Sequence, residues 1–160
     1  MKAIDRSRRR LYPGGRPSRL SRVLNRASAW VHALGVWPRR LVTLEVAGRR
    51  TGRLISFPLV MVDLDGDRYL VAMLGGETNW VRNIRAAGGR AVLRHGVRED
   101  VHLEEVEPAA RPPILRRYLA CAPGARPHIP VDRRASLDAI ANVAPQIPVF
   151  RVTSASPLPR

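Results

Sequence analysis

The sequence has 160 residues, of which 45% are hydrophobic, and it carries a formal net charge of +15 at pH 7. This length supports one domain around one core, and no apolar run approaches the roughly 20 residues of a membrane-spanning helix. Cys121 is the only cysteine, which excludes an intrachain disulfide or a multi-cysteine metal site, and the basic N-terminus lacks the apolar stretch of a secretory signal, so we expect a cytoplasmic protein.

The first 26 residues hold about half of the excess positive charge. They carry +8, and the rest of the chain carries +7. We expect residues 1–17 to form a disordered basic tail and residues 20–34 to form an amphipathic helix with arginines on its polar side. Such a helix can pack on the body of the protein, which is the interpretation we favour, or it can cover a pocket, or it can make peripheral contact with the inner face of an anionic membrane. We expect no nucleic-acid partner, because an aromatic content of 5% is too low for base-stacking platforms.

Three consecutive strands are predicted next. Residues 41–48 and 54–64 are rich in β-branched side chains and are joined by the turn GRRTG. Asp65-Gly66 matches the type I′ turn of a two-residue hairpin and leads into a third strand over residues 69–74. The three strands therefore form a meander.

The second half of the chain alternates between helices and strands. We predict a short helix over residues 77–89 that ends at Gly88-Gly89, and a hairpin over 90–108 that turns at His95-Gly96. The remaining predictions are helices over 109–124 and 136–144, a strand over 147–153, and a disordered tail over 154–160. Six short strands with peripheral helices indicate an α+β protein with a small, mostly antiparallel barrel, formed by one domain over residues 18–153.

Motifs for polar catalysis are missing from the sequence. It has no G-x-G-x-x-G, no Walker A loop, no G-x-S-x-G elbow and no H-E-x-x-H. The four histidines are scattered singly, and Asp63, Asp65 and Asp67 alternate along a hairpin without the glutamate of a calcium loop. We expect no metal and no catalytic side chain. Redox chemistry on a bound cofactor fits better, since the cofactor then supplies the reactive atoms.

Residues 44–86 contain five motifs in a recognisable order. These are a turn of glycine, two basic residues, threonine and glycine (48–52); a strand with Pro58-Leu59; a hairpin; a small-residue loop ending in Gly-Gly (72–76); and a helix with Trp80 and Asn83. In this order they resemble the deazaflavin-dependent nitroreductase family, whose members bind coenzyme F-420 on a split β-barrel. The resemblance implies the same fold, with coenzyme F-420 as the cofactor and FMN as the less favoured alternative.

The resemblance also implies which residues contact the cofactor. Coenzyme F-420 has an anionic phosphodiester and glutamyl tail, so a turn with exposed N–H groups and guanidinium side chains suits it. We therefore predict a phosphate cradle at Arg49, Arg50 and Thr51. The resemblance implies that the strand beside the ring of the cofactor contributes Ile55, Ser56 and Phe57. It implies that the loop along the polar edge of the ring contributes Ala72, Met73, Leu74 and Gly75. It also implies that the helix that forms a wall of the pocket and completes the anion site contributes Asn79, Trp80, Val81, Arg82 and Asn83.

This chain departs from the family at three positions. Leu74 and the Leu54-Ile55 pair stand where many relatives have basic residues, and Val60 stands where they have an aromatic residue of the substrate pocket. The candidates to replace the lost anion contacts are Arg53, Arg82 and the N-terminal arginines.

The expected function is hydride transfer from reduced F-420 to an electron-poor small molecule, namely a quinone, an enone or a nitro compound. The alternatives are a non-catalytic protein that binds or sequesters F-420, an FMN-binding split-barrel protein, and a basic protein that binds membrane surfaces or nucleic acid. A homodimer is compatible with the resemblance.

Overall fold

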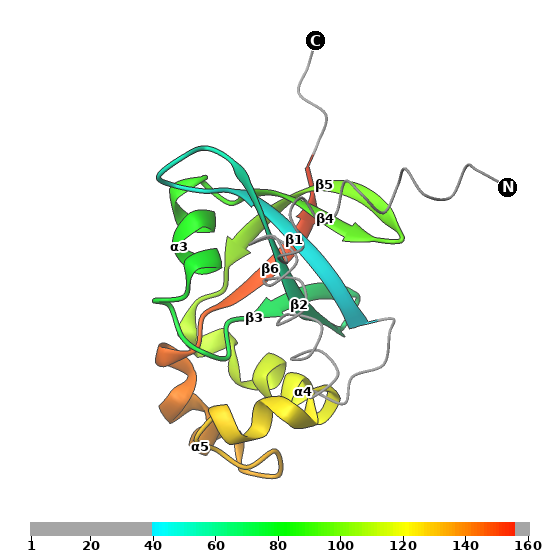
Figure 1. Ribbon diagram of the computed structural model, residues 1–160. Coiled ribbons are helices and arrows are strands. Elements are labelled where there is room, and N and C mark those ends of the chain that lie inside the picture. The colour runs from blue at the N-terminus through cyan, green and yellow to red at the C-terminus, as the bar shows by residue number, and fades with distance from the viewer. Residues whose placement is uncertain (1–39, 156–160) are drawn as a thin grey trace, which may run out of the picture.

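The computed structural model describes residues 40–155, in which six antiparallel strands form a closed barrel (Figure 1). Hydrogen bonding joins the strands in the order β1-β2-β3-β6-β5-β4. Their bounds are Leu41–Ala47 for β1, Leu54–Leu64 for β2, Asp67–Val71 for β3, Arg90–His95 for β4, Val97–Glu105 for β5 and Val149–Ser154 for β6. The predicted α+β barrel is confirmed, while the helix predicted over 20–34 and the tail predicted over 1–17 lie outside the described residues.

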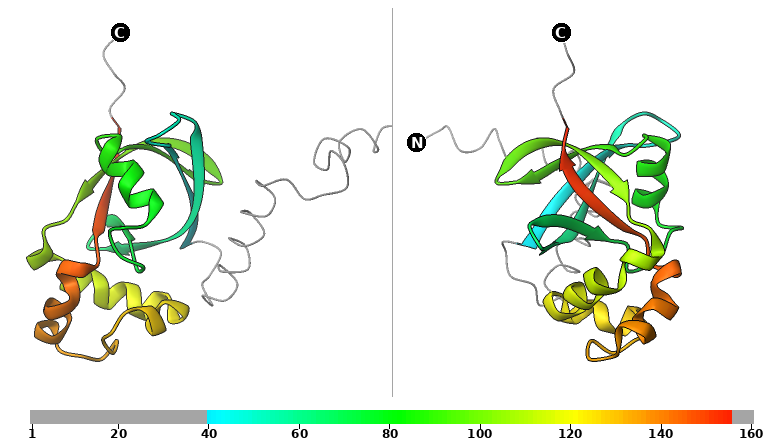
Figure 2. Two further views of the ribbon diagram at one scale, coloured as in Figure 1. Left: turned by 60° about the vertical axis from the view of Figure 1, so that its left-hand side comes forward. Right: turned by 180° about the vertical axis from the view of Figure 1, so that it is seen from behind.

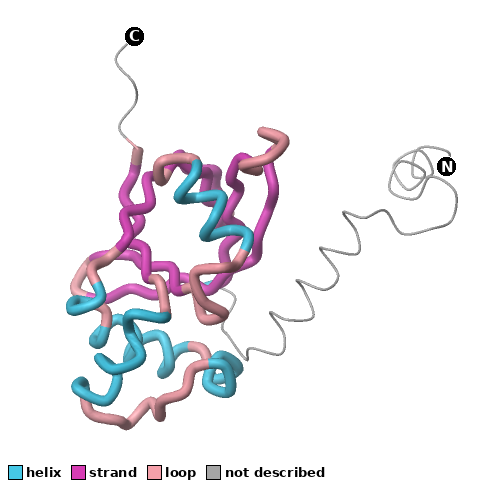
Figure 3. The backbone as a smooth tube through the Cα atoms, turned by 90° about the vertical axis from the view of Figure 1, so that its left-hand side faces the viewer, coloured by secondary structure: helices cyan, strands magenta, loops and turns pink. Residues whose placement is uncertain are grey.

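Within residues 40–155, three α-helices pack against the barrel or against one another. They are α3 (Asn79–Ala86), α4 (Pro112–Cys121) and α5 (Leu137–Val143), and short 3-10 turns cover Pro108–Ala110, Pro123–His128 and Ala144–Gln146. Figures 2 and 3 show α3 across the open end of the ring of strands, with α4 and α5 packed together below the barrel. None of the helices in residues 40–155 is both long and apolar enough to cross a membrane.

Two hydrophobic cores result from this arrangement. The first fills the barrel and includes Leu44, Leu70, Phe150 and the inner face of α3. The second lies between the barrel and the α4–α5 pair. Strand β2 serves both cores, because side chains alternate along a strand: Phe57, Leu59 and Met61 pack against the first core, and Val60 and Val62 belong to the second.

The meander predicted for the first three strands is confirmed. β1 pairs with β2 and β2 with β3, both antiparallel. Asp65 and Gly66 both have positive φ, 53° and 85°, as a type I′ turn requires. The strand predicted over 69–74 ends early at Val71: the Ala72 N–H donates to Pro148 O at 2.9 Å, but Pro148 has no N–H with which to continue the pairing.

Other element boundaries differ from the predicted ones because of prolines and backbone hydrogen bonds at the ends of the elements. The helix predicted over 109–124 divides into a 3-10 turn, α4 and a second 3-10 turn, with Pro112 and Pro123 in the first turn of the segments that they begin. Strand β6 runs to Ser154, and the Ala155 N–H donates to Asp100 O at 2.9 Å. The tail predicted to begin at residue 154 therefore starts with a strand residue.

A buried arginine ties the second core to the end of β5. Arg111, only 4% exposed, precedes α4. Its Nε donates to Val106 O at 2.7 Å, and its Nη1 donates to Ala144 O at 2.9 Å and Ile147 O at 3.2 Å. Its Nη2 lies 3.3 Å from Glu105 Oε1. One guanidinium thus joins the end of β5 to the segment that contains Ala144 and Ile147, which lie 33 and 36 residues further along the chain than Arg111.

Glu99 makes the stability of the barrel depend on pH. Arg68 donates to both of its carboxylate oxygens at 2.8 Å, and Ser154 Oγ donates to Oε1 at 2.7 Å. Hydrogen bonds from Arg68 and then from Ser154 lower the pKa of Glu99 from 4.5 to about 2. Because the pKa is lower in the folded state, the stabilisation is complete above pH 4.5 and is lost as the pH falls towards 2.

We therefore expect Glu99→Gln to have a lower free energy of unfolding than the wild type, with a deficit about 1 kcal/mol larger at pH 6 than at pH 2.5. The effect is no larger because solvent screening weakens a partly exposed ion pair. Urea unfolding of both proteins across this pH range measures the difference. A difference that stays constant with pH would contradict the assignment.

Candidate functional site

The arginine turn between β1 and β2 is closed by backbone hydrogen bonds. The Gly48 N–H donates to Arg53 O and the Gly52 N–H donates to Gly48 O, each at 2.8 Å. A Cβ at Gly48 would lie 2.9 Å from Cδ1 of the exposed Ile55 side chain and 3.3 Å from Arg53 O, so any larger residue here would require Ile55 to move. Arg50 and Thr51 are exposed at the tip of the turn.

Asn83 of α3 holds this turn in place. Its Oδ1 accepts hydrogen bonds from Arg49 Nη1 at 2.9 Å and from the Arg49 backbone N–H at 3.3 Å. The same Nη1 lies 3.5 Å from Asn79 Oδ1. Asn83 is 1% exposed, so its side chain anchors the turn from within the protein. The result is a fixed turn in which Arg49 is engaged with α3 and Arg50 makes no ion pair within the described residues.

A cavity of about 400 Å³ lies beside the start of α3. Its wall is largely apolar, and the Trp80 ring in it packs against Phe150 with ring centroids 5.4 Å apart. The lining residues are Phe57, Pro58, Leu59, Val60, Val71, Met73, Leu74, Thr78, Asn79, Trp80 and Tyr118. Five of the predicted contact residues, Phe57, Met73, Leu74, Asn79 and Trp80, thus meet at one cavity, and Asn79 connects it to Arg49.

The loop after β3 offers backbone donors at this cavity. Gly75 has a φ of 91°, and its N–H donates to Ala72 O at 2.9 Å, so the loop folds back on itself. The N–H groups of Met73 and Leu74 make no hydrogen bond within residues 40–155. The Ala72 N–H, by contrast, is occupied by Pro148 O. Two of the four predicted loop residues therefore present free donors.

The other predicted residues lie around the cavity without lining it. Val81 is fully buried in the barrel core, and Arg82 is exposed and ion-paired with Glu77. On β2, Ile55 is exposed and Ser56 is half-buried. These four positions flank the turn and the cavity.

Tyr118 is the main residue that the sequence did not point to. It comes from α4 and is 3% exposed, and burial raises its pKa far above the usual value. No motif of the sequence analysis assigns it a role. Val60, which stands where relatives have an aromatic residue of the substrate pocket, does line the cavity. The wall is completed by residues that were not predicted as contacts: Pro58, Leu59, Val71 and Thr78.

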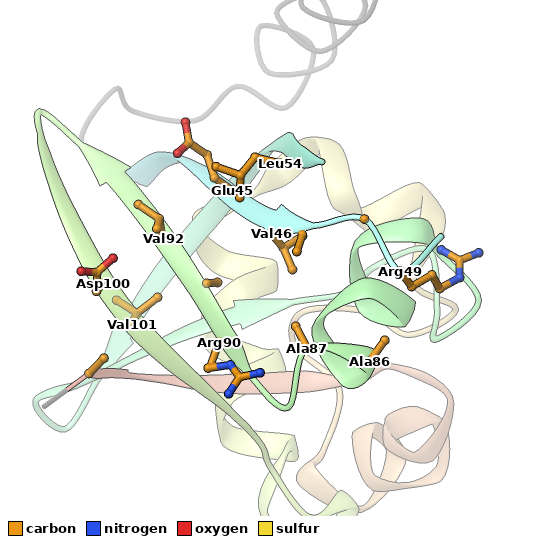
Figure 4. A pocket seen from close by; sticks show the side chains of 14 residues that line it. Glu45, Val46, Arg49, Leu54, Ala86, Ala87, Arg90, Val92, Asp100 and Val101 are labelled. Carbon is orange, nitrogen blue, oxygen red and sulfur yellow. The ribbon is translucent and has the colours of Figure 1, made fainter. Parts of the chain in front are cut away.

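A second and larger cavity, of about 800 Å³, lies where β1 and β4 separate (Figure 4). These strands pair only over Thr43–Glu45, and the space beyond is bounded by the end of α3. Figure 4 shows Arg49 at one end of this cavity and Asp100 at the other. Arg49 is the only predicted contact residue in its wall, so the smaller cavity is the better candidate site.

Comparison with known proteins identifies the family of this chain. Residues 21–133, which include the turn and the whole cavity wall, match the family model of the F420H2-dependent quinone reductases. The chain belongs to this family. As an F420H2-dependent quinone reductase family member it is an oxidoreductase, and its cofactor is coenzyme F-420, of which F420H2 is the reduced form. No curated protein sequence matches it.

Several solved structures share the fold. An F420H2-dependent reductase (FDR-A) is 22% identical, with a TM-score of 0.53, over 74% of this chain and 97% of that one. A protein described as a domain-swapped dimer is 19% identical, with a TM-score of 0.53, over 81% and 96% of the two chains. A putative pyridoxamine 5′-phosphate oxidase from Listeria innocua is 9% identical, with a TM-score of 0.51, over 81% and 94%. At these identities the likeness shows the barrel fold of this F420H2-dependent family member and nothing of its substrate.

Proposed function

We propose that this protein transfers hydride from reduced coenzyme F-420 to a quinone held in the cavity of about 400 Å³. The observation that carries the proposal is that the apolar cavity and the arginine turn lie next to each other. Asn79 lines the cavity, and its Oδ1 lies 3.5 Å from Nη1 of Arg49 in the turn. A planar ring with an anionic tail needs these two environments side by side.

The residues present fit this cofactor. The free N–H groups of Met73 and Leu74 face a polar ring edge as donors, and Phe57 and Trp80 supply apolar walls. Arg50, exposed at the tip of the turn, makes a charge-assisted contact with the phosphodiester. When bound, the reduced cofactor supplies hydride from C5 of its deazaflavin ring.

The role of the chain is then to hold donor and acceptor in contact and to exclude water from between them. A quinone is the acceptor favoured by the family description and by the apolar wall, over an enone or a nitro compound. No side chain of the turn or of the loop is assigned as an acid, and water supplies the proton.

Titration of the purified full-length protein tests this function. We expect coenzyme F-420 to bind with quenching of its fluorescence, and FMN and NADPH to bind weakly. Reduced F-420 should then be oxidised in the presence of menadione, a soluble naphthoquinone. Purification as a stoichiometric yellow FMN complex that does not quench added F-420 would refute the proposal.

We also propose that the basic N-terminal segment, which lies outside the described residues, brings the protein to anionic membranes, where quinones dissolve. Deletion of residues 1–16 should leave folding unchanged and weaken sedimentation with anionic vesicles, since each basic residue near such a surface contributes about 1 kcal/mol. Neutral vesicles are the control. Equal sedimentation of the full-length and shortened proteins would exclude this contact.

A further inference from the structure

The wall of the candidate cavity contains two buried residues that carry a polar side-chain atom, Trp80 and Tyr118. The indole of Trp80 can only donate a hydrogen bond, whereas the hydroxyl of Tyr118 can both donate and accept. The remaining hydroxyl of the wall, that of Thr78, already donates to Gly75 O at 3.0 Å. Tyr118 is therefore the wall residue whose hydroxyl is available.

The Tyr118 hydroxyl has no hydrogen-bond partner in residues 40–155. The hydroxyl oxygen is nevertheless not fully enclosed by protein atoms. Among the described residues, Asn83 Nδ2 is the only side-chain polar atom that is both fully enclosed and without a partner. The residue as a whole is 3% exposed, and the open space that it borders is the cavity. No residue in 40–155 satisfies the hydroxyl, and this cavity is the space that Tyr118 lines.

An apolar pocket with one unpaired hydroxyl favours an apolar ligand that has an oxygen able to accept a hydrogen bond. Leaving a buried hydroxyl unpaired is unfavourable, and a ligand oxygen that accepts its proton removes that penalty. Burial raises the pKa of Tyr118 far above its ordinary value, so the hydroxyl keeps its proton and acts as a donor at any pH at which the protein is used. A carbonyl oxygen at the edge of a flat apolar molecule is the complementary group.

We propose that Tyr118 is a positioning residue that donates a hydrogen bond to a carbonyl oxygen of the hydride acceptor, and that it restricts the acceptor to planar apolar molecules with a carbonyl at one edge. The proposal rests on the proposed function, since it concerns the same cavity. The hydrogen bond withdraws electron density from the acceptor ring and fixes its orientation. Tyr118 keeps its proton throughout, and no covalent bond to it forms or breaks.

The test compares two ligands and two proteins. Menadione and 2-methylnaphthalene have similar shapes, but only menadione has carbonyl groups. Their dissociation constants are measured with full-length wild type and Tyr118→Phe, each loaded with oxidised coenzyme F-420 so that no hydride is available. We expect the preference for menadione over 2-methylnaphthalene to fall about fivefold to tenfold in Tyr118→Phe, as for the loss of one neutral hydrogen bond.

Tyr69→Phe is the matched control. Tyr69 lies in a different cavity wall and its hydroxyl is 3.4 Å from Asp67 Oδ2, so the preference should stay as in the wild type. An unchanged preference in Tyr118→Phe, or no binding of menadione to the wild type, overturns the assignment. Coenzyme F-420 should bind both proteins equally; failure of F-420 to bind the wild type would instead refute the proposed function.

The carbonyl stretching frequency of bound menadione gives a second measurement that needs no variant. A hydrogen bond lowers this frequency relative to menadione in hydrocarbon solvent. We expect a lowered frequency in the wild type and its return towards the hydrocarbon value in Tyr118→Phe. An unshifted frequency in the wild type would overturn the proposal even if the variant did not fold.

Discussion

Replacement of Arg111 by alanine is expected to lower the free energy of unfolding by about 3 to 5 kcal/mol, since three backbone carbonyls lose a charged donor at about 1 to 3 kcal/mol each. The change removes the donors to Val106 O, Ala144 O and Ile147 O, and it leaves these carbonyls without replacements. Urea unfolding followed by circular dichroism measures the loss.

Arg116, in the helix α4 that Arg111 precedes, provides a control with the same change of charge. It is exposed and donates to a single carbonyl, Ala135 O, at 2.8 Å. Arg116→Ala should reduce the free energy of unfolding by about 0.5 to 1 kcal/mol. If both variants lose the same amount, the buried network around Arg111 does not hold the second core together as described.

Arg50→Ala is expected to raise the dissociation constant of coenzyme F-420 about tenfold to a hundredfold, which corresponds to a charge-assisted hydrogen bond of about 1.5 to 3 kcal/mol. The side chain is exposed and makes no ion pair within the described residues, so the free energy of unfolding should change by less than about 0.5 kcal/mol. The loss of affinity should be larger at low salt than at high salt. Fluorescence titration and thermal unfolding measure the two quantities.

Two further variants test whether F-420 affinity depends on the position of an arginine or only on the net charge of the protein. Arg98→Ala removes one positive charge from the β4–β5 hairpin, away from the site, and should leave F-420 affinity nearly unchanged. Arg53→Ala tests the other side of Gly52, and a larger loss there than at Arg50 would move the anion contact by a few residues along the turn. A lower melting temperature with unchanged affinity in Arg50→Ala would mean that Arg50 has a structural role.

Strands and turns that depend only on a short stretch of sequence were predictable from the residues of that stretch. Strand β2 has the predicted bounds, 54–64, since its β-branched run lies between two turns with strong turn residues. The Asp65-Gly66 hairpin was predictable for the same reason. The order of the strands around the barrel was not predictable, because β6 pairs with both β3 and β5 across long stretches of chain that no periodicity records.

The motifs predicted part of the wall of the candidate cavity, and the rest of the wall was not anticipated. The motifs name residues of β2, the following loop and α3, but Tyr118 reaches the cavity from α4, which carries none of them. A polar residue on a helix can be a ligand or an internal anchor, and the sequence does not distinguish these roles. Asn83, predicted for the anion site, is buried with its oxygen bound to Arg49.

The position of β6 between β3 and β5 also governs how this chain must be made. Until residues 149–154 have been synthesised, β3 and β5 each keep a row of unpaired backbone groups. A growing chain on the ribosome therefore carries two open strand edges through the synthesis of α4 and α5. Chains released before Val149 should pair with one another and aggregate, whereas chains that have passed Ser154 should become soluble in a single step.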